Sequence, residues 1–309
     1  MSRLQLEFAR TVIPILPPLI GARVRSWIYP WRAGIRDGLT VRTKAFTGSL
    51  LECRTSDFHG CPFAVQGYFD WRNTVICAAV WRGGTVIEVG ANVGTETVSF
   101  ADITARGGRL IALEPEEANF ECLRRMVEIN GFAHVHLIRA AAAESDGEIR
   151  FQPPANRQWS GTGRVSAQAE AAEGISVPAM RLDSCLPLVR GRVDAVFADV
   201  EGYEPAVLRG AKEILGRHRP VVVVEASPRL LARNGWSLEV LYGELAGFDY
   251  RAHEIARFGL SGRADLRAGK ATNWVCFPEE DEERMKSVRR ALRWCGWVPL
   301  RLGLRWLVE

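Results

Sequence analysis

Residues 86–94, VIEVGANVG, have the character of a ligand-binding turn between a strand and a helix. Apolar residues lead into a turn whose glycines let the backbone approach a ligand closely. A dinucleotide fingerprint would read GxGxxG, but here Asn92 stands at the position of the middle glycine. Glu88, two residues before Gly90, would repel a pyrophosphate and attract an ammonium group. The turn therefore favours S-adenosylmethionine, whose amino-acid end is zwitterionic, over a dinucleotide.

A second acid supports this interpretation. Glu114 ends the next predicted strand, twenty positions after Gly94. An acid at the end of the second strand of an alternating α/β fold is placed to accept hydrogen bonds from both ribose hydroxyls. The two acids at this spacing predict a site for an adenosyl ligand.

A third group of acids follows a later predicted strand, in the sequence ADVEGYE at 198–204. We expect Asp199 to lie nearest the cofactor and the acceptor, Glu201 to act as base or to position the acceptor, and Glu204 to cap the next helix. Glu225 ends another strand and would approach the same cleft, where several acids raise one another's pKa. They could also ligate a divalent cation. Because the motif contains no histidine, we predict no metal site.

The elements that must position these residues alternate regularly between strand and helix. Strands are predicted at 85–89, 109–114, 133–142, 192–200 and 219–226, and helices at 95–105, 115–130, 204–218 and 237–248. An antiparallel pair, 249–256 with 271–278, would close the sheet, and 144–174 is expected to form a hairpin and a loop. Before this region, we expect a hairpin or edge strands at 40–55 and a helix at 69–81. This pattern predicts a doubly wound, mostly parallel α/β sheet.

Charge divides the chain of 309 residues into three parts. Residues 1–44 carry a net charge of +6 and residues 284–309 also +6, so that 45–283 carries −8 within the total of +4. We predict a basic, Trp- and Pro-rich N-terminal segment, a central domain and a basic amphipathic C-terminal helix with these bounds. An acidic central domain makes nucleic acid an unfavourable partner.

The two basic ends leave two interpretations open. Trp294, Trp297 and Trp306 among cations are typical of a helix on an anionic membrane surface. Alternatively, both ends pack on the central domain or on a second copy of the chain. No segment is long and apolar enough to span a bilayer, no convincing signal peptide is present, and the seven cysteines form no CxxC pair. We therefore expect a cytoplasmic protein, with possible contact to the inner membrane face.

Five ordered blocks of sequence resemble the FkbM family of S-adenosylmethionine-dependent methyltransferases. They are VIEVGANVG, ALEPEEANFECLRRMVEING, AAAAESDGEIRF, RLDSCL and DAVFADVEGYEPAVLRGAKEIL, followed by RPVVVVEA. The resemblance covers about residues 85–226 and implies a seven-stranded Rossmann-like sheet with an antiparallel strand near its C-terminal end. The family's usual first acid is Asp, whereas Glu88 has a longer side chain of the same charge.

The resemblance and the residue chemistry together define a predicted site. Its cofactor-binding residues are Glu88, Gly90, Ala91, Asn92, Gly94, Glu114, Pro115, Asn119, Ala142 and Asp199, and its catalytic residues are Asp199, Glu201 and Glu225. His253 is an alternative base near the predicted cleft mouth.

The predicted function is transfer of a methyl group to a hydroxyl of a sugar, glycan, glycolipid or related natural product. The alternatives are an NAD-dependent sugar-modifying oxidoreductase and a catalytically idle, membrane-associated scaffold. The oxidoreductase is disfavoured by the missing middle glycine and by the acid before the turn.

Overall fold

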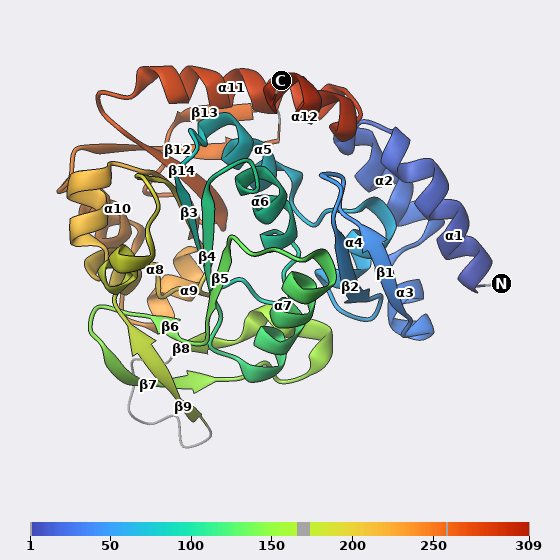
Figure 1. Ribbon diagram of the computed structural model, residues 1–309, viewed down its shortest axis with the longest axis horizontal. Coiled ribbons are helices and arrows are strands. Elements are labelled where there is room, and N and C mark those ends of the chain that lie inside the picture. Colours follow the sequence, from blue (N-terminus) through green and yellow to red (C-terminus); the bar gives the residue numbers. More distant parts are fainter. Residues whose placement is uncertain (1, 166–173, 258, 309) are drawn as a thin grey trace.

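A large mixed sheet forms the centre of the computed structural model, which describes residues 2–165, 174–257 and 259–308 (Figure 1). Its strands are β3 (Thr85–Val89), β4 (Arg109–Leu113), β5 (Val135–Ile138), β10 (Val193–Ala198), β11 (Val221–Ala226), β12 (Tyr250–Ala256), β13 (Gly259–Arg263) and β14 (Thr272–Pro278). The order is β13-β12-β14-β11-β10-β3-β4-β5. The five strands from β11 to β5 are parallel, and β14 is antiparallel to β11. The predicted α/β sheet is confirmed, with β13 as an eighth strand beyond the expected seven.

Helices cover both faces of this sheet, as a doubly wound fold requires. One face carries α5 (Trp71–Val80), α6 (Thr97–Thr104), α7 (Glu117–Asn130) and α11 (Glu282–Trp297), and the other carries α8 (Glu204–Arg209), α9 (Pro228–Arg233) and α10 (Leu238–Ala246). The continuous apolar run of β11 is buried between these two layers, which is typical of parallel strands. The helix expected at 204–218 ends at Arg209, and a π-helical turn, Ile214–His218, follows it.

A smaller helical lobe precedes the sheet. It contains α1 (Ser2–Val12), a 3-10 turn (Ile13–Ile15), α2 (Pro18–Ile28), α3 (Trp31–Asp37) and α4 (Gly60–Gln66). Leu6, Ile13, Tyr29 and Val65 form its buried core. Strand β1 (Thr40–Lys44) pairs with β2 (Leu50–Arg54), so this antiparallel hairpin crosses the boundary expected at residue 44.

A second sheet lies beside the C-terminal edge of the parallel strands. It consists of β6 (Ala141–Ala142), β7 (Gly147–Gln152), β8 (Arg164–Val165) and β9 (Ile175–Met180), with a 3-10 segment (Arg157–Thr162) between β7 and β8. A further 3-10 segment, Leu182–Leu188, leads back to the main sheet. Residues 166–173, part of the loop expected at 144–174, lie outside the described residues.

The basic C-terminal segment forms two helices instead of the single predicted helix. α11 begins at Glu282, and the chain turns at Val298 and Pro299 before α12 (Leu300–Val308). Proline interrupts the helical hydrogen bonding at this point. Val288, Leu292 and Cys295 on one side of α11 are buried against the core, so this side packs on the domain.

Chain order reverses between β3 and β10. From β3 the chain proceeds to β4 and β5 on one side, and it later returns to β10 and β11 on the other side. Ligands in open α/β sheets bind at the carboxyl ends of the strands at such a point. The turn after β3 begins at Gly90 and the turn after β10 begins at Asp199, so the predicted acids and the predicted glycine turn meet there.

Candidate active site

The glycine turn and the β10 turn touch directly. Gly90 has a φ of +81°, and a Cβ atom on it would lie 2.0 Å from the carbonyl oxygen of Asp199. The close approach of the β10 turn therefore requires glycine at position 90. The approach of a ligand would be a second reason for glycine there. Gly94 has a φ of +91°, and a Cβ on it would lie 3.0 Å from a side-chain carbon of Leu123 on α7. The turn thus places α6 and α7 tightly against the sheet.

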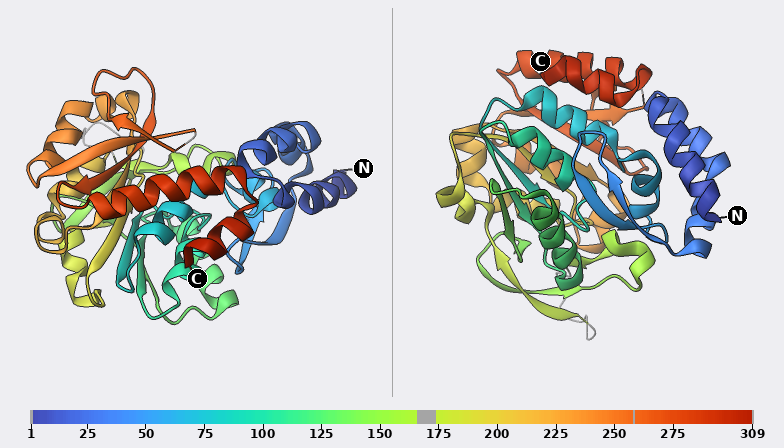
Figure 2. Two further views of the ribbon diagram at one scale, coloured as in Figure 1. Left: turned by 90° about the horizontal axis from the view of Figure 1, so that it is seen from above. Right: turned by 45° about the vertical axis from the view of Figure 1, so that its right-hand side comes forward.

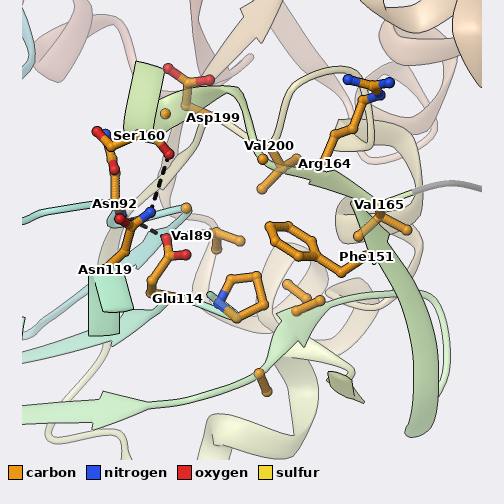
Figure 3. A pocket seen from close by; sticks show the side chains of 17 residues that line it. Val89, Asn92, Glu114, Asn119, Phe151, Ser160, Arg164, Val165, Asp199 and Val200 are labelled. Carbon is orange, nitrogen blue, oxygen red and sulfur yellow. Dashed lines mark hydrogen bonds between the residues drawn. The ribbon is translucent and has the colours of Figure 1, made fainter. Parts of the chain in front are cut away.

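A pocket, called here the turn pocket, opens beside this contact (Figure 3). The predicted residues that line it are Gly90, Asn92, Glu114, Pro115, Asn119, Ala142 and Asp199. Phe151 and Val165 of the second sheet form an apolar side of the pocket. Ala91 and Gly94 do not line it: Ala91 is buried, and its N–H donates to the carbonyl of Leu113. The structure therefore brings most of the predicted cofactor-binding residues together at this pocket, whereas Ala91 and Gly94 shape the turn.

Glu114 is held at the bottom of the turn pocket by backbone donors. One carboxylate oxygen accepts the N–H of Asn92 at 2.8 Å, and the other accepts the N–H of Glu116 at 2.9 Å. Burial raises the pKa of Glu114 to about 7, although both hydrogen bonds act in the opposite direction. The carboxylate is consequently fixed in orientation, with lone pairs left over for a ligand.

Three buried polar atoms in the turn pocket have no partner among the described residues. They are Asn92 Oδ1, Asn119 Oδ1 and Ser160 Oγ. The rest of each residue is held in place: for example, Asn119 Nδ2 donates to the carbonyl of Ser160 at 3.2 Å. Buried polar atoms normally form hydrogen bonds, so these three indicate a ligand that supplies them. Acceptors beside a fixed carboxylate suit the hydroxyl and amino groups of an adenosyl ligand.

A second pocket, called here the acid pocket, lies on the other side of Gly90. Four carboxylates line it, those of Glu88, Glu96, Asp199 and Glu225, together with the amides of Asn73 and Asn273. Val89, Gly90 and Asp199 line both pockets, which are therefore adjacent. Burial raises the pKa of Glu88 to about 8, and it also raises that of Glu96. An oxygen of Glu88 is buried without a hydrogen-bond partner among the described residues, as expected if a cationic group binds there.

Three acids converge beside the acid pocket. Asp199, Glu204 and Glu225 each place a carboxylate oxygen within 4.8 Å of the others. Desolvation by the surrounding protein raises the pKa of Asp199 to about 6, although its side chain is exposed at the pockets. Burial, with the charges of Asp199 and Glu204, raises the pKa of Glu225 to about 9. This spacing would also allow a divalent cation to bind. The absence of a metal therefore stays a prediction.

Glu201 occupies a strained turn that Glu204 maintains. The φ of Glu201 is +56°, a left-handed conformation that costs a residue other than glycine about 1–2 kcal/mol. Glu204 Oε1 accepts the N–H groups on both sides of Glu201, from Val200 at 3.1 Å and from Gly202 at 3.3 Å. Burial and the charge of Asp199 raise the pKa of Glu201 to about 7. Glu201 lines neither pocket directly, although its neighbour Val200 lines the turn pocket.

Sequence reasoning missed several residues at the site and misplaced one. His59 lies beside Asn92, with its Nδ1 2.5 Å from Asn92 Nδ2, and burial lowers its pKa. Ser160 reaches the turn pocket from the 3-10 segment between β7 and β8, and Glu96 reaches the acid pocket from the position just before α6. His253, expected near the cleft mouth, lies inside strand β12, and its Nδ1 is 3.2 Å from the carbonyl oxygen of Gly262. The structure therefore does not bring His253 among the converging acids.

The fold and the two adjacent pockets define a class of protein, the Rossmann-like methyltransferases. Residues 88–252 match the family described as the Methyltransferase FkbM domain, and because the match spans more than half of the chain, the protein belongs to this family. A curated relative, the 2-O-methyltransferase NoeI of Sinorhizobium fredii (strain NBRC 101917 / NGR234), is 25% identical over 202 residues, which are 60% of this chain and 79% of the relative.

Solved structures of methyltransferases are also similar to this chain. Methyltransferase FkbM from Methylobacillus flagellatus KT has a TM-score of 0.42 and 16% identity, over 63% of this chain and 44% of its own. The tRNA (uracil-54, C5)-methyltransferase of Pyrococcus abyssi, in complex with S-adenosyl-L-homocysteine, has a TM-score of 0.39 and 16% identity. The similarity covers 77% of this chain and 44% of that protein. The chain thus spans less than half the length of these two proteins.

Family membership makes this chain a methyltransferase and S-adenosylmethionine its cofactor. The residues present fit that cofactor, because the turn pocket offers a fixed carboxylate and unsatisfied acceptors, and the acid pocket offers Glu88. The oxidoreductase alternative is thereby set aside.

Proposed function

We propose that this chain is an O-methyltransferase that transfers the methyl group of S-adenosylmethionine to a hydroxyl of a sugar, glycan or glycolipid, or of a related natural product. The observation that carries the proposal is the acid pocket, which adjoins the turn pocket at Gly90 and Asp199. Several carboxyl groups in a small cleft suit a neutral acceptor rich in hydroxyls, since a hydroxyl can donate to an ionised carboxylate and accept from a protonated carboxyl group. The printed name of the relative NoeI, a 2-O-methyltransferase, supports the same chemistry.

The turn pocket would hold the adenosyl part of the cofactor, with Glu114 accepting the ribose hydroxyls. Glu88 would attract the ammonium group of the amino-acid part. The cofactor supplies an electrophilic methyl group, so the protein must mainly align the acceptor oxygen and remove its proton.

Two acids near the β10 turn have pKa values that suit different roles. Glu201, with a pKa of about 7, is ionised in a large part of the molecules at neutral pH and would take the proton that the acceptor hydroxyl releases. Glu225, with a pKa of about 9, carries a proton at neutral pH and would donate a hydrogen bond to the acceptor. Asp199 lines both pockets and would orient the reacting groups.

Two variants test these roles. Glu201→Gln should lower kcat by at least about 100-fold and leave the affinity for S-adenosylhomocysteine unchanged, because only the base is removed. Glu225→Gln resembles the protonated acid and should keep most of the activity, so it is the matched control. Full activity of Glu201→Gln would refute the base assignment, and an inactive Glu225→Gln with an active Glu201→Gln would reverse the roles.

The acceptor class requires a separate experiment. Full-length protein and methyl-labelled S-adenosylmethionine are incubated with an extract from source cells that lack the gene, and the products are fractionated. We expect alkali-stable label in the glycan or glycolipid fraction, because methyl ethers resist the alkali that cleaves methyl esters. Label confined to protein or nucleic acid would refute the proposal, and no label in any fraction would favour the idle scaffold.

A further inference from the structure

The outer side of α11 is basic and aromatic, although its inner side is part of the core. Six residues of α11 line a shallow groove on this outer side, together with Val298 just after the helix: Lys286, Arg289, Arg290, Arg293, Trp294 and Trp297. They are called here the basic-aromatic face. Lys286, Arg290, Arg293 and Trp297 follow one another at helical spacings of four, three and four residues and are all exposed. The helix thus presents a continuous stripe of cations that ends in tryptophan.

Most cations of this face have no ion pair with a neighbouring acid among the described residues. Lys286 pairs with Glu282 at 2.8 Å, but within the described residues no ion pair is recorded for Arg289, Arg290 or Arg293. The only acids on α11 lie in its first turn, at the opposite end from the tryptophans. The face therefore has a net positive charge, in contrast to the net charge of −8 on 45–283.

Exposed apolar side chains of the N-terminal lobe lie next to this face. α11 meets α2 at Gly296, where an added Cβ would lie 3.2 Å from Leu19. Trp297, which follows Gly296, is 59% exposed, and Ile20, which follows Leu19, is 45% exposed. In both views of Figure 2 the end of α11 lies against the N-terminal helices.

α2 continues the same pattern. Ile20, Arg23 and Trp27 occur at spacings of three and four residues and are all exposed, Trp27 to 80%. Such a combination of tryptophan, aliphatic residues and arginine on adjoining helices is typical of surfaces that contact lipid headgroups.

We propose that the basic-aromatic face, together with the exposed side of α2, docks this enzyme on an anionic lipid surface. Charge complementarity identifies this occupant, because several cations attract anionic headgroups and tryptophan prefers the headgroup region. The apolar side of α11 is already used by the core, so docking is superficial and mainly electrostatic. Within the described residues no helix is long and apolar enough to cross a membrane.

The aromatic end of the basic-aromatic face lies near the end of α5 that reaches the acid pocket. Gly296 of α11 lies near Trp71, in the first turn of α5, and Asn73 in the same turn lines the acid pocket. The aromatic end of α11 is thus on the side of the acid pocket rather than at the opposite edge of the sheet. This inference does not depend on the identity of the methyl acceptor, because it concerns only the surface.

Vesicle co-sedimentation of the full chain tests the inference. We expect binding to vesicles of phosphatidylglycerol and phosphatidylcholine, loss of binding at high salt, and little binding to phosphatidylcholine alone. Each cation near an anionic surface contributes about fivefold to partitioning, so Arg290→Glu with Arg293→Glu should weaken it by at least about 25-fold. Trp294→Ala with Trp297→Ala should weaken it by about fivefold or more, without changing the charge.

A matched control carries the same charge change elsewhere. Arg267 and Lys270 are exposed in the loop before β14, whose Leu266 and Ala268 pack on the core of the opposite sheet face. Arg267→Glu with Lys270→Glu should bind vesicles within about twofold of the parent chain, and circular dichroism should show all variants folded. Equal binding of the parent chain to neutral and anionic vesicles, or none to either, would overturn the proposal.

Two other occupants have their own signatures. If the face joined two copies of the chain, the tryptophan variants would dissociate a dimer detected by light scattering without vesicles. If it were a general polyanion surface, duplex DNA would bind as tightly as the vesicles and lose affinity in the same arginine variants. Either result would also overturn the lipid proposal.

Discussion

Glu114→Gln offers a sharp test of the cofactor site, because both carboxylate oxygens of Glu114 have known partners. The amide of glutamine keeps one acceptor oxygen and replaces the other with a donor NH2 group. In the parent chain the carboxylate accepts the N–H of Asn92 at 2.8 Å and the N–H of Glu116 at 2.9 Å. Whichever way the glutamine amide is turned, its NH2 group faces one of these two N–H donors. The variant therefore loses one backbone hydrogen bond and the charge that would accept a ribose hydroxyl.

The expected loss of affinity follows from the lost charged hydrogen bond. A hydrogen bond to a charged group contributes about 1.5–3 kcal/mol, which corresponds to about a 10- to 150-fold weaker binding of S-adenosylhomocysteine. The donor left without an acceptor costs stability in addition, about 1–3 kcal/mol in the free energy of unfolding. Since the pKa of Glu114 is about 7, binding should be measured at pH 8, where the parent carboxylate is ionised.

Isothermal titration calorimetry with S-adenosylhomocysteine measures this effect, and Glu117→Gln provides its control. Glu117, three residues further on at the start of α7, forms an exposed ion pair with Arg139 and does not line the turn pocket. Glu117→Gln should bind within about twofold of the parent chain. If Glu114→Gln also bound within twofold, Glu114 would not contact the cofactor, and the assignment of the turn pocket would be wrong.

Two further predictions concern stability. Glu88 has a pKa of about 8 in the folded chain against about 4.5 when exposed, so the ligand-free protein should lose stability as pH rises from about 4.5 to about 8. Glu88→Gln should make the decline of Tm with pH shallower in thermal unfolding, and an unchanged decline would show that Glu88 ionises freely. Glu201→Gly should raise the free energy of unfolding by about 1 kcal/mol, because glycine adopts a φ of +56° without strain, while kcat falls. A less stable Glu201→Gly variant would contradict the strain argument, and retained kcat would contradict the base assignment.

Local sequence patterns were sufficient to predict the central sheet and the turn pocket. The glycine turn, Glu114 and Asp199 each follow a strongly apolar strand directly, so their place at one edge of the sheet follows from strand direction alone. The same reasoning predicted the closing antiparallel pair β12 and β14. It missed β13, because GLSGR contains two glycines and little of the β-branched character that identifies a strand.

Residues that reach the site through tertiary packing could not be found in this way. His59 lies before α4 in the N-terminal lobe, and Ser160 lies in an irregular segment between β7 and β8. Neither belongs to a periodic element whose direction could be inferred. By contrast, the break between α11 and α12 had a visible signal in Pro299, which should have ended the predicted helix.

The strained residues connect the two halves of the site. Of the described residues other than glycine, four have positive φ values, and two of these, Asn92 and Glu201, lie at the glycine turn and the β10 turn. Asparagine tolerates the left-handed conformation, so Asn92 needs little support. Glutamate does not, and the two hydrogen bonds that Glu204 accepts from Val200 and Gly202 hold Glu201 there. Glu204 is therefore a positioning residue. The strain at Glu201 is explained if its left-handed conformation aims the Glu201 carboxylate at the acceptor hydroxyl.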